Sequence, residues 1–288
     1  MSKTVLVTGT SSGFGKDIAL TLAQSGHHVF ATMRGVSGKH SEAAKALQAA
    51  GIEVIELDVT KDASVTAAVK LLFDKTGGKL DVVINNAGAL FSGISETITS
   101  EQALQIFDVN VVGIQRVLRA VLPNLRRNGS GLVINVGSIL GRLTIPFMGL
   151  YGASKFAVEA MTDSYRYELS QLGIDVVLVQ PGPYPTNLYS DIAGSDSARA
   201  DEYGPIAEIP KAFGEFIGTL FSSKDAPNPH DVAEQIAKLI DTPAGQRPPR
   251  LVVGLPFGAD AANAAIEPIQ NQLISGVQMD GLKTLKTA

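Results

Sequence analysis

Short apolar runs alternate along the chain with longer amphipathic stretches. The runs, rich in β-branched residues, lie at 5–7, 29–31, 54–57, 82–84, 132–134, 176–179 and 251–253. Helical stretches lie between them at 14–25, 41–50, 62–76, 101–127, 152–172, 206–221 and 230–241. Nearly continuous apolar character is typical of strands buried on both faces of a parallel sheet. The alternation predicts an α/β fold, a doubly wound and mostly seven-stranded parallel sheet with helices on both faces, in a single domain.

Residues 181–229 depart from this alternation. Pro and Gly cluster there, and one helical stretch, 206–220, stands among several apolar residues: Tyr184, Leu188, Tyr189, Ile192, Tyr203, Ile206, Phe213 and Phe216. Long connections inside a compact domain are usually functional or disordered. We interpret this segment as a substrate lid inserted in a catalytic domain over residues 1–254. Residues 255–288 form a tail of weak periodicity, to which we assign no role.

Composition excludes several classes of protein. The chain has 288 residues, 45% of them apolar, with no cysteine and a net charge of -4. Without cysteine there is no disulfide framework or thiolate metal site, and we expect no metal. The negative charge argues against a nucleic-acid partner. No signal peptide or apolar run long enough to span a membrane is visible, so we expect a cytoplasmic protein.

A glycine-rich turn follows the first predicted strand and opens the first helix. It reads Thr8-Gly9-Thr10-Ser11-Ser12-Gly13-Phe14-Gly15. Glycines let backbone N–H groups approach a ligand, and a helix N-terminus attracts anions, so a dinucleotide pyrophosphate would fit here. The spacing differs from the usual dinucleotide fingerprint. Residues 9–13 also match the nucleophile elbow of hydrolases, for which His230 is the one late histidine, and a turn without a ligand is a third interpretation.

The end of the second strand indicates which dinucleotide would bind. An acid there would accept a hydrogen bond from the adenosine ribose, but the sequence reads Ala31-Thr32-Met33-Arg34. A guanidinium suits a 2′-phosphate. We therefore predict NADP(H), with Arg34 as its 2′-phosphate ligand. The alternative is that Arg34 and Lys39 are ordinary solvated residues.

A tyrosine and a lysine lie one helical turn apart in Tyr151-Gly152-Ala153-Ser154-Lys155. Side chains at i and i+4 share a helix face. A cation beside a phenol favours the phenolate and brings the phenol's pKa toward neutral pH, where it can transfer protons. Ser138 ends the fifth strand, at the sheet edge where ligands bind in doubly wound folds. The pair alone is also common on ordinary protein surfaces.

Polar residues end other strands at the same edge. Asp58 closes the third strand and Asn85-Asn86-Ala87-Gly88 follows the fourth, while Asn110 lies in an otherwise apolar helix. A buried amide needs a hydrogen-bond partner. Each residue has a structural explanation when taken singly, but together they predict one polar site.

These motifs, taken jointly, resemble the classical short-chain dehydrogenase/reductase family, over about residues 3–190. The ATMR turn and residues 138–169 are similar to its retinol and 17-beta-hydroxysteroid dehydrogenase branch. The resemblance implies a Rossmann-type oxidoreductase. Tyr151 would be the general acid/base, Lys155 would hold the nicotinamide ribose, and Ser138 would bind the substrate oxygen. Asn110 would organise a water chain that feeds protons through Lys155.

The resemblance also implies a set of cofactor contacts. Gly9, Gly13 and Gly15 would line the pyrophosphate, Asp58 would contact the adenine and Thr186 the carboxamide. The remaining contacts are Ser11, Ser12, Phe14, Val59, Asn86, Ala87, Gly88, Tyr151, Lys155, Pro181 and Gly182. Met33 stands where NAD-dependent members carry an acid, in keeping with NADP(H).

The expected substrate is a small hydrophobic ketone or secondary alcohol. The predicted pocket walls are apolar: Leu140, Phe147, Met148, Tyr184 and Leu188. Such walls fit many ligands, so the particular substrate stays open. The helices at 101–127 and 152–172 are apolar on more than one face, and members of the family associate through them, so we expect a homodimer or homotetramer. A protein that binds NADP(H) without catalysis is the alternative from another class, although it would typically lack Tyr151 or Lys155.

Overall fold

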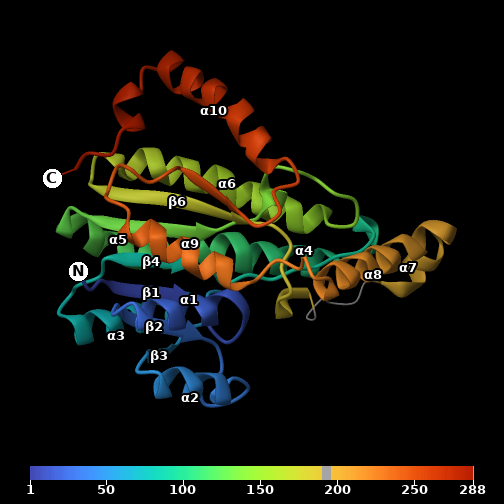
Figure 1. Ribbon diagram of the computed structural model, residues 1–288, viewed down its shortest axis with the longest axis horizontal. Coiled ribbons are helices and arrows are strands. Elements are labelled where there is room, and N and C mark those ends of the chain that lie inside the picture. The colour runs from blue at the N-terminus through green and yellow to red at the C-terminus, as the bar shows by residue number, and fades with distance from the viewer. Residues whose placement is uncertain (190–195, 288) are drawn as a thin grey trace.

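A computed structural model describes residues 1–189 and 196–287, and its centre is one parallel sheet. The strand order is β3-β2-β1-β4-β5-β6-β7, and every neighbouring pair is parallel (Figure 1). The strands are β1 Thr4–Thr8, β2 His28–Met33, β3 Glu53–Glu56, β4 Val82–Asn85, β5 Gly131–Val136, β6 Ile174–Pro181 and β7 Arg250–Val253. Each contains one of the predicted apolar runs or most of it. The doubly wound fold is confirmed.

Helices cover both faces of the sheet and extend beyond it (Figure 1). Their bounds are α1 Gly13–Gln24, α2 Ser41–Ala49, α3 Asp62–Thr76, α4 Ser100–Phe107, α5 Gly113–Asn128, α6 Gly149–Ser170, α7 Ser197–Asp201, α8 Ile209–Ser222, α9 His230–Asp241 and α10 Ala259–Gly276. Short 3-10 turns lie at Ser95–Thr97 (η1), Ile139–Gly141 (η3), Asn187–Tyr189 (η4), Gly204–Glu208 (η5) and Asp280–Lys283 (η6). Among the described residues, no helix combines the length and the hydropathy that a bilayer crossing needs.

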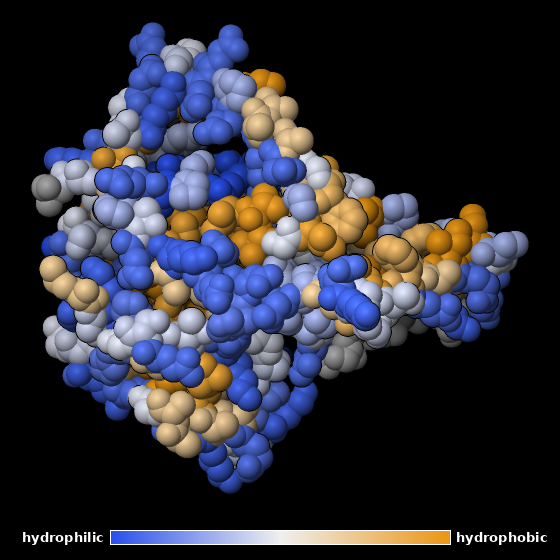
Figure 2. Space-filling view, in the orientation of Figure 1, coloured by the Kyte–Doolittle hydropathy of each residue, from blue (hydrophilic) through white to orange (hydrophobic). Residues whose placement is uncertain are grey.

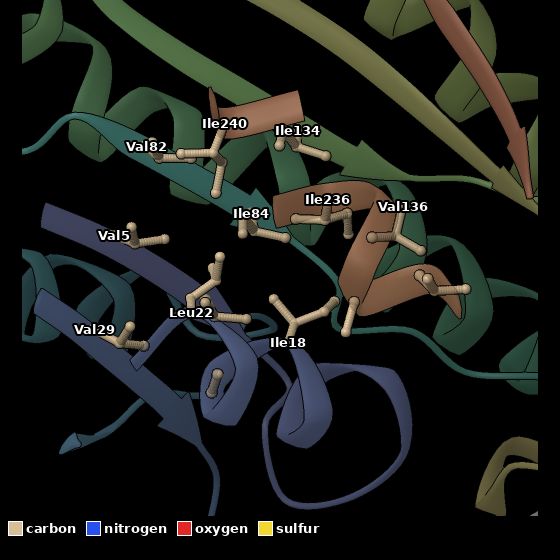
Figure 3. Packing of buried hydrophobic residues seen from close by; sticks show 14 of the residues in the cluster. Val5, Ile18, Leu22, Val29, Val82, Ile84, Ile134, Val136, Ile236 and Ile240 are labelled. Atoms are coloured by element: carbon tan, nitrogen blue, oxygen red, sulfur yellow. The ribbon is translucent and has the colours of Figure 1, made fainter. Parts of the chain in front are cut away.

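Two hydrophobic cores lie on the two faces of the sheet. On one face, α1 and α9 bury Ile18, Leu22 and Ile236 against the strands (Figure 3). On the other, α5 and α6 bury residues such as Leu118 and Val158. Successive strand residues point to opposite faces, so Val5 belongs to the first core and Leu6 to the second. Because both cores hold the same strands, the sheet edge that carries the site is fixed from both sides.

The predicted helix at 101–127 is interrupted in the structure. A π-helical segment, Asp108–Val112 (η2), separates α4 from α5, and it contains Asn110. A Cβ on Gly113 would lie 3.0 Å from the Val59 side chain, so the chain passes very close to the loop after β3 here. Such π-segments are frequent at functional sites. The apolar periodicity of the sequence continued through this interruption and did not reveal it.

The lid and the tail contain more helix than the sequence indicated. The structure gives the predicted lid the helices α7 and α8, which project away from the sheet, and Figure 2 shows hydrophobic surface along this projection. Residues 190–195 of the predicted lid, among them Ile192, lie outside the described residues. The tail, residues 255–288, showed only weak periodicity in the sequence, but in the structure it forms α10. It is mostly exposed and rests on the fold through few positions, so its apolar residues carry no clear helical stripe.

Candidate active site

A single cavity of about 1130 Å³ runs along the carboxyl ends of the strands, from the glycine turn to the lid. It brings together most of the residues predicted for the site: Gly9, Ser11, Ser12, Gly13, Phe14, Arg34, Asp58, Val59, Asn86, Ala87, Gly88, Ser138, Leu140, Met148, Tyr151, Lys155, Pro181, Gly182, Tyr184, Thr186 and Leu188. Three predicted residues, Gly15, Asn110 and Phe147, do not line it. The predicted residues therefore gather around one cavity with three exceptions, and their roles stay predictions.

The glycine turn is shaped by two close approaches. Gly9 has a positive φ of 71°, and a Cβ on it would lie 2.7 Å from the Ala87 Cα. Gly15 does not face the cavity, because a Cβ on it would lie 2.3 Å from the Gly9 carbonyl oxygen and 2.4 Å from Asn86 Nδ2. Gly15 thus allows α1 to pack on the turn, and the expected pyrophosphate contact is not supported by its position.

Gly13 provides the open side of the same turn. Its φ is 54°, and the nearest atom to a Cβ there is the Thr186 Cβ, 3.7 Å away across the cavity. It begins α1, whose first N–H groups have no partners within the helix. Backbone donors without Cβ atoms in front of them fit the pyrophosphate of a dinucleotide. The cavity therefore fits the group that the sequence predicted.

The cavity continues past the glycine turn to the carboxyl ends of β2 and β3, and this end carries positive charge. Arg34 lines it and is exposed, and Lys39 and His40 lie beside it in the same wall. Burial tends to raise the pKa of Asp58, but hydrogen bonds from Thr60 and the charge of Arg34 hold it below its ordinary value. The Asp58 Oδ1 accepts these bonds from the Thr60 N–H at 2.9 Å and hydroxyl at 2.7 Å.

Glu56 fixes the loop after Arg34, a role that sequence reasoning missed. Its two carboxylate oxygens accept hydrogen bonds from the Gly35 N–H at 2.8 Å and the Val36 N–H at 2.7 Å. Glu56 pairs with Met33 in the β2–β3 register, which places it directly beside this loop. The available signal in the sequence was a glutamate at the end of β3, the strand that pairs with β2 beside the loop at Arg34.

Helix α6 places Tyr151 and Lys155 side by side under the lid. Tyr151 is 6% and Lys155 7% exposed, and the Lys155 Nζ lies 5.7 Å from the centre of the Tyr151 ring. The Lys155 ammonium donates a hydrogen bond to the Val136 carbonyl oxygen at 3.0 Å. Burial lowers the pKa of Lys155 from 10.5 to about 8. An ammonium that loses its proton near neutral pH is suited to proton transfer.

Ser138 and Asn110 organise the loops around this pair. Ser138 Oγ accepts a hydrogen bond from the Leu140 N–H at 3.1 Å and so starts η3. Asn110 accepts from the Ala89 N–H at 2.8 Å and donates to the Ala89 carbonyl and to Ser154 Oγ, each at 3.0 Å. Both amide hydrogens of Asn110 are thus used to hold the loop after β4 against α6. A water chain through Asn110 stays a prediction.

The lid end of the cavity is apolar. Leu90, Phe91, Phe213 and Phe257 join the predicted Leu140, Met148 and Leu188 in lining it. Phe257 comes from the segment after β7, in which the sequence showed no chemistry. Phe147 lies outside the lining, on a backbone with a positive φ of 65°, and its carbonyl accepts from the Gly93 N–H.

Tyr184 is mainly a core residue rather than a pocket wall. It is 1% exposed, and its ring meets the Phe14 ring edge-on, with 5.4 Å between centres. Burial and the nearby Asp231 raise the pKa of its phenol to about 12. Its contribution to a substrate surface is therefore small, and its main contact is with the helix that follows the glycine turn.

The lid is fastened to the rim of the cavity. The Glu96 carboxylate accepts a hydrogen bond from the Tyr203 hydroxyl and pairs with Arg199 at 3.1 Å. Exposed ion pairs contribute little, about 0.2–1 kcal/mol. The Asp196 N–H adds a backbone hydrogen bond to the Thr97 carbonyl at 3.0 Å, and the role of this segment as a lid stays a prediction.

The fold and the cavity together define a dinucleotide-dependent oxidoreductase, and comparison with known proteins agrees. Residues 3–195 match the short chain dehydrogenase family. The chain is 36% identical over 256 residues to the human 17-beta-hydroxysteroid dehydrogenase type 1, covering 84% of this chain and 76% of that protein. The protein therefore belongs to the short chain dehydrogenase family, near the branch that the sequence indicated.

Solved structures of similar proteins hold either nicotinamide dinucleotide. The actinorhodin polyketide ketoreductase, solved with NADPH, is 29% identical, with a TM-score of 0.72 over 87% of this chain and 95% of that one. A short chain dehydrogenase from Burkholderia phymatum, solved with NAD, is 25% identical, with a TM-score of 0.74 over 94% and 95%. A nicotinamide cofactor is common to both.

The family assignment replaces the hydrolase interpretation of residues 9–13. In the structure His230, the late histidine that such an enzyme needs, begins α9 and pairs with Asp17 on α1, 2.9 Å away. It is not among the residues that line the cavity beside Ser11. His230 thus has a structural partner.

Proposed function

We propose that this protein transfers a hydride between NADP(H) and a hydrophobic ketone or secondary alcohol, with Tyr151 as the general acid/base. The observation that carries the proposal is the continuity of one cavity. It joins the glycine turn, the Tyr151–Lys155 pair and an apolar chamber under the lid. Oxidoreductases need a cofactor and a substrate to meet at one proton donor, and this cavity has a place for each.

NADP(H) is supported by the charge at the adenosine end. Arg34, Lys39 and His40 line that end, and β2 ends in Met33 rather than an acid. Arginine binds phosphate through a planar pair of donors. Glu56 accepts hydrogen bonds from two backbone N–H groups of the loop after Arg34. The backbone next to Arg34 is therefore held in place before a phosphate binds.

The reaction would use the following residues. A nicotinamide dinucleotide supplies or accepts the hydride when it is bound. Tyr151 donates its phenolic proton to the carbonyl oxygen during reduction and takes it back during oxidation, and Lys155 stabilises the phenolate between these steps. Ser138 binds the same substrate oxygen. Positioned acids of this kind contribute about 10²–10⁴-fold to a rate.

The substrate class follows from the lid end of the cavity. Its side chains include Leu90, Phe91, Met148 and Phe213. A charged substrate would lose its hydration there without a countercharge. A steroid-sized apolar ketone or alcohol is therefore favoured, in keeping with the name of the human relative.

The test is turnover of NADPH across a panel of steroids, retinoids, quinones and small aryl ketones. We expect wild type to reduce at least one member, and Tyr151→Phe to lose about 10²–10⁴-fold in kcat while it binds NADPH within a few-fold of wild type. Tyr165→Phe, which changes a phenol elsewhere on α6, is the matched control. A Tyr151→Phe variant that kept its activity would contradict the proposed mechanism, and binding without turnover in wild type would favour a cofactor-binding protein.

The choice of cofactor is tested separately with Arg34→Ala. We expect wild type to prefer NADPH over NADH in kcat/KM. The substitution should lower kcat/KM with NADPH by about tenfold or more, the value of a charge-assisted hydrogen bond of ~1.5–3 kcal/mol, and leave NADH unaffected. Lys45→Ala, on the exposed side of α2 where Lys45 pairs with Glu42, is the control. A wild-type preference for NADH would refute the assignment.

We also propose a homodimer or homotetramer that forms through α5 and α6. Val112, which ends the π-segment just before α5, and Phe156 on α6 are each about two-fifths exposed, at 41% and 43%. Leu104 on α4 is 71% exposed. These side chains extend the second apolar face that the sequence indicated, and light scattering in solution would measure the assembly. The cytoplasmic location stays a prediction.

A further inference from the structure

Four polar side chains form a closed ring of three hydrogen bonds and one ion pair behind the active-site cavity. Arg142 donates through Nε to Asn263 Oδ1 at 3.0 Å, and Asn263 Nδ2 donates to Gln180 Oε1 at 2.7 Å. Gln180 Nε2 donates to Glu159 Oε1 at 2.5 Å, and Glu159 Oε2 pairs with Arg142 Nε at 3.1 Å. Each member comes from a different element, and one of them, Asn263, comes from α10.

The Gln180 and Glu159 side of the ring is buried, whereas Asn263 is partly exposed and Arg142 lines a second cavity of about 450 Å³. Gln180 is 0% and Glu159 3% exposed, and the Arg142 side chain is 13% exposed. Arg250 adds a hydrogen bond to Glu159 at 2.9 Å and also pairs with Asp163. Buried polar networks are rigid when every member is satisfied and costly when one member is lost. Removal of a single partner is therefore felt by the rest of the ring.

The ring fastens three segments that carry the proposed reaction. Arg142 ends the turn η3, which Ser138 starts. Glu159 lies one helical turn after Lys155 on α6, and a Cβ on Gly141 would lie 2.8 Å from its Cγ. Gln180 immediately precedes Pro181 and Gly182, which line the cavity.

Helix α10 takes part in this arrangement although it lies outside the cavity. It follows β7, beside α6 and at the opposite end of the sheet from β3 (Figure 1). Asn263 connects the η3 turn to the end of β6, two segments that otherwise meet in the ring only through Glu159. The sequence assigned α10 no role, because the partners of Asn263 lie 121 and 83 residues away along the chain.

We propose that Asn263 is a positioning residue, through which α10 holds the Ser138 turn and the Pro181–Gly182 segment in the arrangement that the reaction needs. The proposal rests on the proposed function for its kinetic consequence. It extends the functional unit to a helix that contributes no atom to the cavity wall. Displacements of about 1 Å in reacting groups can cost up to ~10²-fold in rate, so a remote amide can matter.

The test compares Asn263→Ala with Asn271→Ala, an exposed asparagine on the same helix. The enzyme–NADPH complex is mixed with the best ketone of the panel, and a single turnover is followed by cofactor absorbance. We expect the rate constant of Asn263→Ala to fall about tenfold with an unchanged amplitude, because the variant stays folded at the assay temperature although the loss of one ring member lowers its Tm. Asn263→Asp keeps the acceptor for Arg142 but sets a carboxylate oxygen against Gln180 Oε1, so its rate constant should also fall below that of Asn271→Ala.

A second readout does not depend on turnover. The N–H groups of Gly141, Arg142 and Leu143 donate within the η3 turn, to Ser138 or Ile139. Their hydrogen exchange should become faster in Asn263→Ala and stay unchanged in Asn271→Ala. Unchanged exchange in Asn263→Ala, or a loss that appears in amplitude with an unchanged rate constant, would overturn the proposal. An inactive wild type would instead refute the proposed function, and exchange would still test the ring.

Discussion

Lys155 has an ordinary pKa of 10.5, but in this fold its pKa is about 8. The Lys155 ammonium is buried between α6 and the end of β5, with one hydrogen bond, to the Val136 carbonyl. Burial lowers its pKa from 10.5 to about 8 because the charged form loses its hydration. Below about pH 8 both the folded and the unfolded chain hold the Lys155 ammonium, and its burial destabilises the folded state. This destabilisation decreases as the pH rises from about 8 to 10.5, because the folded state loses the proton first.

The pH dependence of activity follows from the same residue. If the cationic form of Lys155 supports Tyr151, kcat/KM should fall above about pH 8, because the pH profile of kcat/KM reports groups of the free enzyme. The measurement is kcat/KM for ketone reduction between neutral and alkaline pH. Lys70→Met, which removes an exposed lysine paired with Asp74, should keep the wild-type profile. A profile that stays flat to the alkaline limit of the folded state would contradict the assignment.

Residues of the site were predictable where chemistry and strand position coincide. Tyr151, Lys155 and Ser138 carry functional groups at strand ends or on one helix face, which are local properties of the sequence. Glu56 and Asn263 escaped prediction because their roles depend on partners that the fold supplies, 20 or more residues away along the chain. Tyr184 lines the cavity as predicted, but its burial in the core was not foreseen, because an aromatic residue next to prolines suits a lid and a core edge equally well.

At the scale of elements, close contacts between backbones decide how the turn and helix α1 meet. Gly15 sits where α1 passes over the glycine turn, against the Gly9 carbonyl and the Asn86 side chain. Asn86 Nδ2 donates to the Thr8 carbonyl at 2.9 Å and the Gly9 carbonyl at 3.1 Å, so it ties the end of β4 to the end of β1. Helix α1 can reach this joint since position 15 has no side chain.

Gly15→Ala should separate these elements. The added Cβ would lie 2.3 Å from the Gly9 carbonyl oxygen, so the helix or the turn must move. We expect a loss of about 1–3 kcal/mol in stability, as for overpacked cores, together with weaker NADPH binding. Gly38→Ala is the control, because its nearest neighbour is 4.0 Å away. Denaturant unfolding and cofactor titration would measure both effects, and wild-type values for Gly15→Ala would show that the turn yields freely.

The elements themselves differed in how well the sequence predicted them. Each strand contains a run of three or four mostly apolar residues, and all seven were found from these runs. The π-segment at Asp108–Val112 was missed because it keeps the apolar pattern of a helix while changing its hydrogen bonds. Helix α10 was missed since it buries little apolar surface, and amphipathic periodicity reports only apolar packing.

The whole molecule is one sheet held between two cores, and this arrangement followed from the sequence alone. Alternating strands and helices fix the doubly wound topology, because parallel neighbours need helical crossovers. The location of the site at the carboxyl ends of the strands follows from that topology. The topology does not determine the path of the lid or the position of α10, because neither is required to complete the sheet.

The two cores should unfold together, since the six strands β1 to β6 contribute side chains to both. Ile236→Ala on α9 and Leu118→Ala on α5 each remove a fully buried side chain, one from each face. Large-to-small changes of this kind cost about 2–5 kcal/mol. We expect each variant to melt in a single transition at lower temperature, measured by calorimetry.

The double variant distinguishes one cooperative unit from two. The two side chains lie on opposite faces of the sheet and share no core cluster, so their effects should add within about 0.5 kcal/mol while the transition stays single. Leu71→Ala, at a residue of α3 that is 43% exposed, should leave the melting temperature near wild type. Two separate transitions in either single variant would mean that the faces unfold independently. The sheet edge that carries Tyr151 and the glycine turn would then lose its support from one side before the other.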